Sequence, residues 1–388
     1  MSWPMVEAGQ FMCRRGGAIN PVKFPDEIFD LLSIPSYDNQ EIEVLAGCDI
    51  GSSKIILEPR DVLLSKIVPH IRRCWVVPES RGRKQIGSGE WIVFRDKRFY
   101  PQFLKHFLMS DVFHRQFMNT VAGVGGSLVR ARPAEVSKIK IPLPPLAEQQ
   151  RIATILDKAD AIRQKRQQAI KLAEDFLRSV FLEMFGDPVT NPKGWTVGTI
   201  RDLVTSVNYG TSAKASETDG EFPILRMGNI TYEGKWDFTD LKYIDLSEKD
   251  QDKYLAKKGD LLFNRTNSKE LVGKTAVFNE EESMAIAGYL IRVRTNELGN
   301  PWYISAYLNS IHGKQTLLNM CKSIVGMANI NAQELQDIQI MLPPLSLQDR
   351  FASIVNAVNE RLSKNAVSSN YLTDLFNALS QKAFSGQL

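Results

Sequence analysis

Apolar side chains recur every three or four residues through two long stretches of the chain. The first stretch runs from Leu146 to Phe185 and the second from Leu345 to Ser385, and neither contains proline or glycine. A run of this length far exceeds the usual helix of about 11 to 12 residues. At 1.5 Å per residue, each stretch predicts a helix about 60 Å long.

The apolar positions in each stretch form a narrow stripe of heptad character. We predict a seam in the first through Ile152, Ile155, Ala159, Ile162, Arg166, Ala169, Ala173, Phe176 and Val180. A looser seam follows in the second through Phe351, Ile354, Val358, Leu362, Leu372, Leu375, Leu379 and Ala383. We expect the two stripes to cover one another in an antiparallel coiled coil. The alternative is two separate helices, each packed on its own domain.

The two stretches belong to a larger internal repeat. Ile139–Leu146 and Ile338–Leu345 both contain a Pro-Pro pair, which ends a strand near Ile141 or Ile340. Phe185 and Phe384 are 199 residues apart, as are the other matched positions of the repeat. The run Pro59–Ile67 matches Lys258–Asn267 at the same offset, so the repeat includes globular parts.

This repeat predicts an α+β fold with two mixed α/β domains joined by two long antiparallel coiled-coil helices in pseudo-twofold symmetry. We expect a first domain at 1–140, a central helix at 141–187, a second domain at 188–340 and a distal helix at 341–388.

Composition adds a local charge imbalance. The formal net charge is +4, but residues 60–132 hold 14 Lys/Arg and 5 Asp/Glu, a balance of +9. Such an excess indicates a surface that faces phosphate; the alternative is a solvated basic face. The four cysteines are scattered, without metal or disulfide spacing, and no secretory leader or membrane-length apolar run is present. These features favour a cytoplasmic protein.

No catalytic or metal-binding pattern emerges from the sequence. Gly273-Lys274-Thr275 resembles the end of a phosphate-binding P-loop, but Ser268 stands where the first glycine of that motif is required. The four histidines lack metal-ligand spacing, and the Asn/Asp-Pro-Pro-aromatic tetrapeptide of adenine-N6 methyltransferases is absent. We therefore expect neither an enzyme nor a bound metal or cofactor in this chain.

Polar loops with small residues indicate DNA binding instead. Backbone amides and Lys contact phosphates, Arg bonds guanine, and Asn bonds adenine. Each candidate alone is equally well explained as an ordinary surface residue. The candidates are Ser52, Ser53, Lys54, Ser65, Lys66, Arg72, Arg73, Arg83, Lys84, Thr211, Ser212, Lys214, Arg226, Asn229, Asn264, Arg265 and Asn267.

Three segments resemble a known family. The block Ile141–Ala153, continued through Phe181–Pro188, is similar to the central region of type I restriction-modification specificity subunits. The segment Leu342–Leu388 is similar to their distal region, and Gly259–Arg265 resembles their recognition domains. The first domain departs from the pattern, because Ala8-Gly9-Gln10 replaces the usual Leu-Gly-Asp and Arg60 replaces glycine.

The resemblance implies a non-catalytic subunit in which 1–140 and 188–340 are target recognition domains, each for one half of a split, asymmetric double-stranded DNA target. It also implies that the central and distal helices act as spacers. The expected partners of such a subunit are two methyltransferase subunits, which bring S-adenosylmethionine and flip the target adenine, and restriction-translocase subunits that use ATP and Mg. It also implies that the methyltransferase docks on Glu148, Gln149, Arg151, Gln348 and Arg350. The alternative function is a coiled-coil adaptor that binds protein and not DNA.

Overall fold

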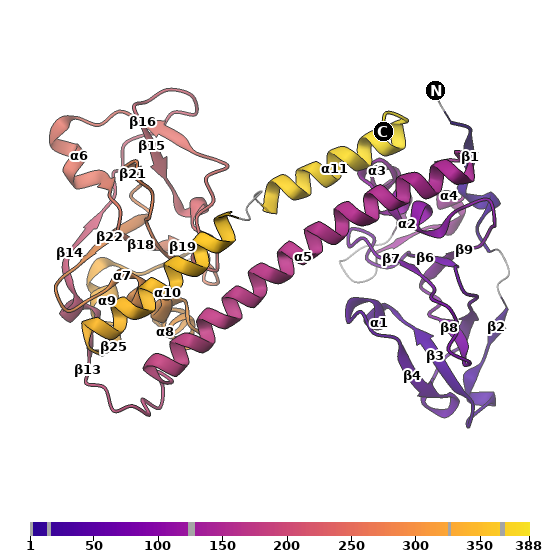
Figure 1. Cartoon of the computed structure of the whole chain (residues 1–388), viewed down its shortest axis with the longest axis horizontal. Helices are drawn as coiled ribbons and strands as arrows, with labels where there is room; N and C mark the ends of the chain where they lie inside the picture. Colours follow the sequence, from indigo (N-terminus) through magenta and orange to yellow (C-terminus); the bar gives the residue numbers. More distant parts are fainter. Residues whose placement is uncertain (1–2, 14–16, 123–128, 325–326, 365–368) are drawn as a thin grey trace. The chain divides into compact units, whose positions relative to one another are not determined.

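The computed structural model describes residues 3–13, 17–122, 129–324, 327–364 and 369–388 (Figure 1). The chain divides into two compact units. Unit 1 comprises Met1–Gln168 with Val367–Leu388, and unit 2 comprises Ala169–Ala366. Helix α5 (Leu146–Phe185) contributes its first part to unit 1 and its last part to unit 2.

The described strands of unit 1 form two larger sheets and two short antiparallel pairs. The five-stranded sheet has the order β2 (Ala18–Ile19), β5 (Lys54–Ile56), β8 (Lys84–Gly87), β3 (Ile28–Leu32), β4 (Glu43–Ala46). The three-stranded sheet has the order β7 (Cys74–Val76), β6 (Val62–Ser65), β9 (Trp91–Phe94). The pairs are β1 (Met5–Glu7) with β12 (Lys140–Pro142), and β10 (Val121–Ala122) with β11 (Arg130–Ala131).

Apart from α1, whose Ile34 and Tyr37 pack in a separate cluster, the helices of unit 1 pack on the three-stranded sheet around an aromatic core. This core joins strand residues such as Leu64 to phenylalanines of the helices, with Phe103 and Phe113 fully buried. The helices are α1 (Ile34–Asp38), α2 (Pro101–Met109), α3 (Asp111–Met118), α4 (Pro133–Val136), the start of α5, and α11 (Ser369–Ser385). Helices α2 and α3 are separated at Ser110, whose hydroxyl accepts the Phe113 N–H and caps α3.

Unit 2 repeats this plan with three larger sheets among its described strands. The first sheet has the order β14 (Val204–Tyr209), β22 (Leu290–Thr295), β18 (Leu261–Asn264), β20 (Thr275–Val277). The second has the order β16 (Lys242–Ile244), β15 (Phe222–Leu225), β21 (Met284–Ile286), β17 (Leu255–Ala256). The third has the order β19 (Thr266–Asn267), β24 (Met327–Asn329), β23 (Lys322–Ile324). Strand β13 (Val197–Thr199) pairs antiparallel with β25 (Gln339–Met341). The helices are α6 (Glu248–Tyr254), α7 (Pro301–Asn309), α8 (Ile311–Met320), α9 (Ala332–Gln336) and α10 (Leu345–Lys364).

The 199-residue offset survives in specific contacts. In unit 1, Arg95 Nε donates to Asp61 at 2.7 Å, and the Glu58 N–H donates to the same carboxylate. In unit 2, Arg294 Nε donates to Asp260 at 2.8 Å, and the Lys257 N–H donates to it. The two units therefore share a fold down to a buried carboxylate. The predicted fold class, two mixed α/β domains with long helices, is confirmed.

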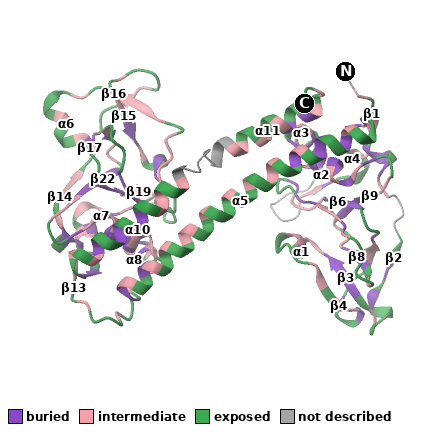
Figure 2. Ribbon diagram, viewed as in Figure 1, coloured by how far each residue is buried: buried purple, intermediate pink, exposed green. Residues whose placement is uncertain are grey.

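Helix α5 follows the predicted seam at five of its nine positions, and at the other four the less exposed residue is the next one along the chain. Its less exposed positions step by four and three through Ile152, Leu156, Ala159, Arg163, Arg166, Ile170, Ala173, Leu177, Val180 and Met184. Of the four positions that differ, the predicted Ile162 and Phe176 are 57% and 51% exposed, and Arg163 and Leu177 are less exposed. Much of α5 is exposed along its length (Figure 2). At Arg163 the reason is that the side chain covers the Phe376 ring at 5.6 Å and pairs with Asp160, which lets a cation occupy the seam.

The predicted pairing of the long helices is present within each unit. In unit 1, Arg151 donates to the Leu388 carbonyl oxygen and Arg163 contacts Phe376, so α5 and α11 are antiparallel. In unit 2, Phe181 packs edge-on against Phe351 of α10. The second predicted long helix is described as α10 and α11, and whether it continues through 365–368 lies outside the described residues. Among the described helices, none combines the length and hydropathy needed to cross a membrane.

Candidate nucleic-acid interface

Four segments of unit 2 meet at the end of strand β18. They are residues 209–214, 264–267, 287–289 and 329–332, which are far apart in the sequence. Backbone hydrogen bonds join them: Thr211 N–H to Ile286 C=O (2.8 Å), Gly288 N–H to Thr211 C=O (2.7 Å), Arg265 N–H to Tyr289 C=O (3.0 Å) and Ile330 N–H to Arg265 C=O (2.9 Å). We call this region the β18 edge. It contains several of the residues predicted to contact DNA.

The close crossing of two of these segments depends on Gly210. A Cβ atom at this position would lie 2.3 Å from the Ile286 carbonyl oxygen and 2.4 Å from that of Ala287. Both obstacles are backbone atoms, which cannot rotate away. Only glycine therefore lets the segment that begins at Tyr209 approach the segment that ends at Tyr289.

Arg265 is oriented at the β18 edge by an aromatic ring. Its guanidinium carbon lies 4.7 Å from the centre of the Tyr209 ring, and the Tyr209 hydroxyl accepts the Ala332 N–H at 2.9 Å. The Arg265 Nε atom is buried and has no acceptor. The other arginines among the described residues of 188–340 all donate to an acceptor: Arg201, Arg226, Arg292 and Arg294. Arg265 thus presents a fixed cation with open donors, the group that bonds guanine O6 and N7.

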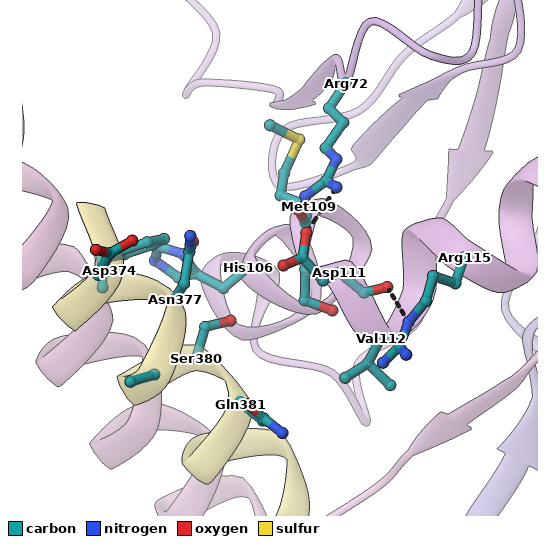
Figure 3. A pocket seen from close by; sticks show the side chains of 13 residues that line it. Arg72, His106, Met109, Asp111, Val112, Arg115, Asp374, Asn377, Ser380 and Gln381 are labelled. Atoms are coloured by element: carbon teal, nitrogen blue, oxygen red, sulfur yellow. Dashed lines mark hydrogen bonds and ion pairs between the residues drawn. The ribbon is translucent and has the colours of Figure 1, made fainter. Parts of the chain in front are cut away.

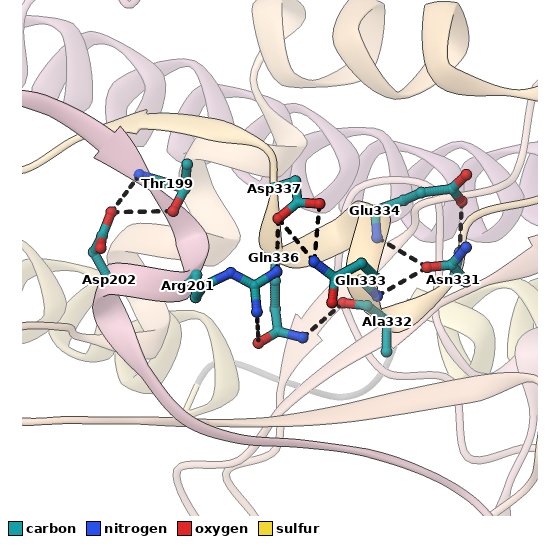
Figure 4. Close-up of polar contacts among 9 residues, drawn as sticks. All are labelled: Thr199, Arg201, Asp202, Asn331, Ala332, Gln333, Glu334, Gln336 and Asp337. Carbon is teal, nitrogen blue, oxygen red and sulfur yellow. Dashed lines mark hydrogen bonds and ion pairs between the residues drawn. The ribbon is translucent and has the colours of Figure 1, made fainter.

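A polar network surrounds the start and end of α9, the helix whose Ala332 N–H bonds the Tyr209 hydroxyl (Figure 4). Arg201 donates to Asp337 at 2.6 Å, which joins the 3₁₀ turn Ile200–Leu203 to α9. Arg201, followed by Gln333, lowers the pKa of the Asp337 carboxyl group. Asn331 and Glu334 form a capping box at the start of α9. These contacts anchor α9, and they therefore also fix the position of the backbone at Asn329, which precedes that helix.

Several residues predicted to contact DNA in unit 2 are buried, and for them the prediction is corrected. Thr211 and Asn229 are 7% and 3% exposed, and Asn264 is completely buried. The Asn229 side chain bonds the Asp237 and Asp240 carbonyl oxygens, so it shapes a loop. Their polar atoms face the unit's own backbone or interior because they end or cross buried strands. Ser212 and Lys214 are exposed, and Asn267 is half-buried.

Arg226 occupies a different position from Arg265. Its guanidinium donates to the Asp240 carboxylate at 2.8 Å and to the Asp240 carbonyl oxygen. It lines a cavity of about 280 Å³ together with Met227, Gly228, Asn229, Asp237, Thr239, Asp240 and Tyr289. The ion pair leaves Arg226 only partly available to a phosphate or base.

The predicted basic residues of unit 1 are mostly paired with acids. Arg72, Arg73, Arg83 and Lys84 form ion pairs with Asp111, Asp38, Asp30 and Glu27. Asp38, Asp30 and Glu27 lie outside residues 60–132, over which the excess of positive charge was counted. They therefore neutralise part of that excess in the folded unit. Arg73 is 9% exposed and Ser65 is 2% exposed, and the prediction that these two contact DNA is corrected. The Arg73–Asp38 ion pair joins the segment before β7 to α1, and the Ser65 hydroxyl donates to the Ile67 carbonyl oxygen.

The other candidates of unit 1 lie at its surface. Ser52 and Ser53 are exposed, and Lys54 Nζ donates to the Ser52 hydroxyl at 2.6 Å. Burial lowers the pKa of Lys54. Lys66, which matches Arg265 in the repeat, donates through Nζ to the Gly89 carbonyl oxygen at 2.6 Å. The sequence missed the neighbours of these two matched cations: Glu90, Arg130, Tyr209, Tyr289 and Asn329.

Two of the five predicted docking residues are internal, and the prediction is corrected for them. Gln149 is 1% exposed; its amide accepts the Tyr100 N–H and donates to the Arg98 and Pro144 carbonyl oxygens. Gln348 is completely buried and makes the matching bonds to Asn300, Leu298 and Pro343. Both glutamines fasten the start of a long helix to its own globule. Glu148 and Arg151 pair with one another, and Arg350 is exposed.

A cavity of about 620 Å³ with a mixed polar and apolar lining lies between α2, α3 and α11 in unit 1 (Figure 3). Its wall includes His106, which is 8% exposed and whose Nε2 is 2.7 Å from Asp157 Oδ1 of α5. Burial lowers the pKa of His106, against the opposing effect of Asp157. Within the described residues, no group of three or more His, Cys, Asp or Glu side chains is placed to hold a metal ion.

Comparison with known proteins decides the family. A model described as "Type I restriction modification DNA specificity domain" matches residues 82–172 and 192–368. The chain belongs to this family. Membership makes it a DNA sequence-specificity subunit, as the repeated blocks before each long helix indicate.

The relatives extend over most of the chain. The type I restriction enzyme EcoKI specificity subunit of Escherichia coli (strain K12) is 26% identical over 317 residues, which is 76% of this chain and 67% of that protein. A type I restriction-modification S subunit from M. genitalium covers 99% of this chain and 96% of its own, with a TM-score of 0.62 at 12% identity. A chain solved in work on type I R-M complex assembly covers 100% and 98%, with a TM-score of 0.52 at 22% identity. These two structures share the fold.

Proposed function

We propose that this chain binds a bipartite, asymmetric DNA target, with unit 1 recognising one half-site and unit 2 the other. The observation that carries the proposal is the pair of matched globules with unlike surface groups: Lys66 in one stands where Arg265 stands in the other. One fold used twice with different side chains suits a target whose halves differ in sequence.

The chain supplies recognition, and partner subunits supply chemistry. In this proposal two methyltransferase subunits bring S-adenosylmethionine and methylate a flipped adenine, and restriction-translocase subunits bring ATP and Mg. The long helices act as spacer and docking surface, and the complex works in the cytoplasm. Docking through Glu148, Arg151 and Arg350 remains part of the proposal, since their side chains are at least partly exposed.

Selection from random DNA tests the proposal directly. The full chain, together with its methyltransferase partner, is incubated with duplexes of random sequence at about 0.1 M salt, where charge screening over about 10 Å limits non-specific attraction. The expected result is one motif with two defined halves and an undefined gap. Enrichment of a single uninterrupted motif would contradict two-domain recognition. Absence of any motif would favour the protein-adaptor alternative.

A further inference from the structure

The end of the central strand in each unit is held by the same set of backbone contacts. In unit 1, Lys66 N–H donates to Glu90 C=O at 3.0 Å, and Ala131 N–H donates to Lys66 C=O at 2.8 Å. At the β18 edge, Arg265 N–H donates to Tyr289 C=O at 3.0 Å, and Ile330 N–H donates to Arg265 C=O at 2.9 Å. Every residue in the second set is 199 positions after its counterpart in the first.

The cross-strand register agrees with these bonds. Ile67 pairs with Arg130 in unit 1, and Thr266 pairs with Asn329 in unit 2. Two sets of three residues therefore occupy equivalent backbone positions. We call Lys66, Glu90 and Arg130 the first edge triplet, and Arg265, Tyr289 and Asn329 the second edge triplet.

The side chains at these matched positions differ in every case. In the first edge triplet, Glu90 and Arg130 form an ion pair at 3.1 Å, with side chains 28% and 41% exposed. In the second, Tyr289 is 50% exposed, and Asn329 Oδ1 accepts the Thr266 hydroxyl at 3.0 Å. Neighbouring core positions are buried in both units, as Trp91 and Leu290 show. Chemical variation at constant geometry is what two recognition surfaces of one design require.

We propose that the two edge triplets determine base preference, each for its own half-site. The inference rests on the proposed function, and it goes further by naming three matched positions in each unit. The open donors of Arg265 suit guanine O6 and N7. The Glu90 carboxylate, with Arg130 beside it, suits a base that exposes an amino group, such as cytosine N4. The two half-sites then differ because the triplets differ.

Exchange of the triplets tests this inference. One variant carries K66R, E90Y and R130N; the reciprocal variant carries R265K, Y289E and N329R. The matched control exchanges Lys140 and Gln339 (K140Q with Q339K), which are 199 positions apart, exposed, and on strands away from the triplets. Each full chain, with its methyltransferase partner, selects duplexes from the random library, and its thermal unfolding midpoint is compared with that of the wild type.

The inference predicts that each triplet exchange changes the selected bases in one half-site and leaves the other half-site intact. Affinity for the original half-site should fall about 5- to 150-fold for each lost base contact. The control exchange should select the wild-type motif. An unchanged motif from a triplet variant with a wild-type midpoint would overturn the inference. An equal loss of affinity for all DNA sequences would also overturn the inference, because it would show that the triplet residues contact phosphates and not bases.

A conservative variant covers the case in which a triple exchange unfolds. E90Q keeps the side-chain shape and removes the charge, so it should alter the first half-site at one or two base pairs. If E90Q selects the wild-type motif, the first edge triplet does not determine preference. If the wild-type chain itself selects no motif, the proposed function fails, and that outcome is distinct from failure of the triplet.

Discussion

The Phe185 ring lies 4.7 Å from the Tyr303 ring in unit 2, although 118 residues separate them. The counterpart in unit 1 is Phe384, which lies 5.7 Å from Phe103. The last turn of the first long helix thus completes the core beside the second recognition globule. The last turn of α11 completes the core beside the first. Each globule depends on a helix encoded after the other globule.

Removal of the Phe185 ring should destabilise unit 2 strongly. The side chain is completely buried among Phe181, Tyr303 and Phe351. Phe185→Ala should lower the free energy of unfolding by about 3 to 5 kcal/mol, as expected for a buried aromatic truncated to alanine. Leu182→Ala, on the same helix but 45% exposed, is the matched control. Equal effects of the two variants in denaturant titrations would contradict the assignment.

The buried amide of Gln149 should be equally important to unit 1. Gln149→Ala leaves the Tyr100 N–H and two carbonyl oxygens without their partner. Each unsatisfied buried group costs about 1 to 3 kcal/mol, and water can replace part of the lost hydrogen bonding. We therefore expect the free energy of unfolding to fall by about 2 to 4 kcal/mol. Gln150→Ala, at the adjacent exposed position, should change stability by less than about 0.5 kcal/mol. Similar stabilities for both variants would show that the Gln149 side chain does not stabilise the attachment of α5 to its own globule.

Long-range repetition made the general architecture predictable from the sequence. The Pro-Pro pairs predicted where two strands end, and the runs without proline or glycine that follow them predicted the long helices. The 199-residue offset between Asp61 and Asp260 also placed equivalent strands in the two domains. These features depend on local backbone preference and on repetition, which a sequence displays directly.

Four positions of the α5 seam and the roles of single polar residues could not be predicted in the same way. Ile162 is more apolar than Arg163, but Arg163 lies in the seam, because Phe376 arrives from the far end of the chain. Gln149 looked like a surface residue because two of its three partners, Arg98 and Tyr100, come from a distant segment of the chain. Tyr289 carries no sequence signal of its own. Only its match with Glu90 across the repeat could have indicated it.

Acid should weaken unit 1 through His106. Burial lowers its folded-state pKa below the ordinary value of about 6.5, so the unfolded chain binds the proton more readily. The stability that neutral His106 contributes is therefore present above about pH 6.5 and is lost as the pH falls below that value. Nearby Lys105 adds to the depression, and Asp157 and Asp160 oppose it.

The variant His106→Gln isolates this effect, because an amide can bond Asp157 without titrating. Unfolding free energies of wild type and variant are measured at about pH 7.5 and about pH 5.5. The stability advantage of the wild type should shrink at the lower pH. A constant difference at both values would mean that His106 keeps one protonation state throughout.

Replacement of Arg265 should affect one half-site only. Arg265→Ala removes the open guanidinium above Tyr209, and discrimination at a single guanine position should fall by about 1 to 3 kcal/mol. Lys258→Ala, which removes an exposed ion pair with Glu281 before the start of β18, is the matched control and should leave discrimination unchanged. Competition binding with single-base variants of the selected duplex measures both. Uniform weakening by Arg265→Ala would identify a phosphate contact instead.

The most direct measurement is a methylation map of cellular DNA in cells that express this chain with its methyltransferase partner, compared with cells that express the partner alone. The account predicts methylated adenines within one asymmetric motif, whose two defined halves are separated by a gap of fixed length, and only when the chain is present. Methylation at an unsplit motif, or an identical map without the chain, would contradict the claim that two unlike domains of this protein choose the DNA sequence.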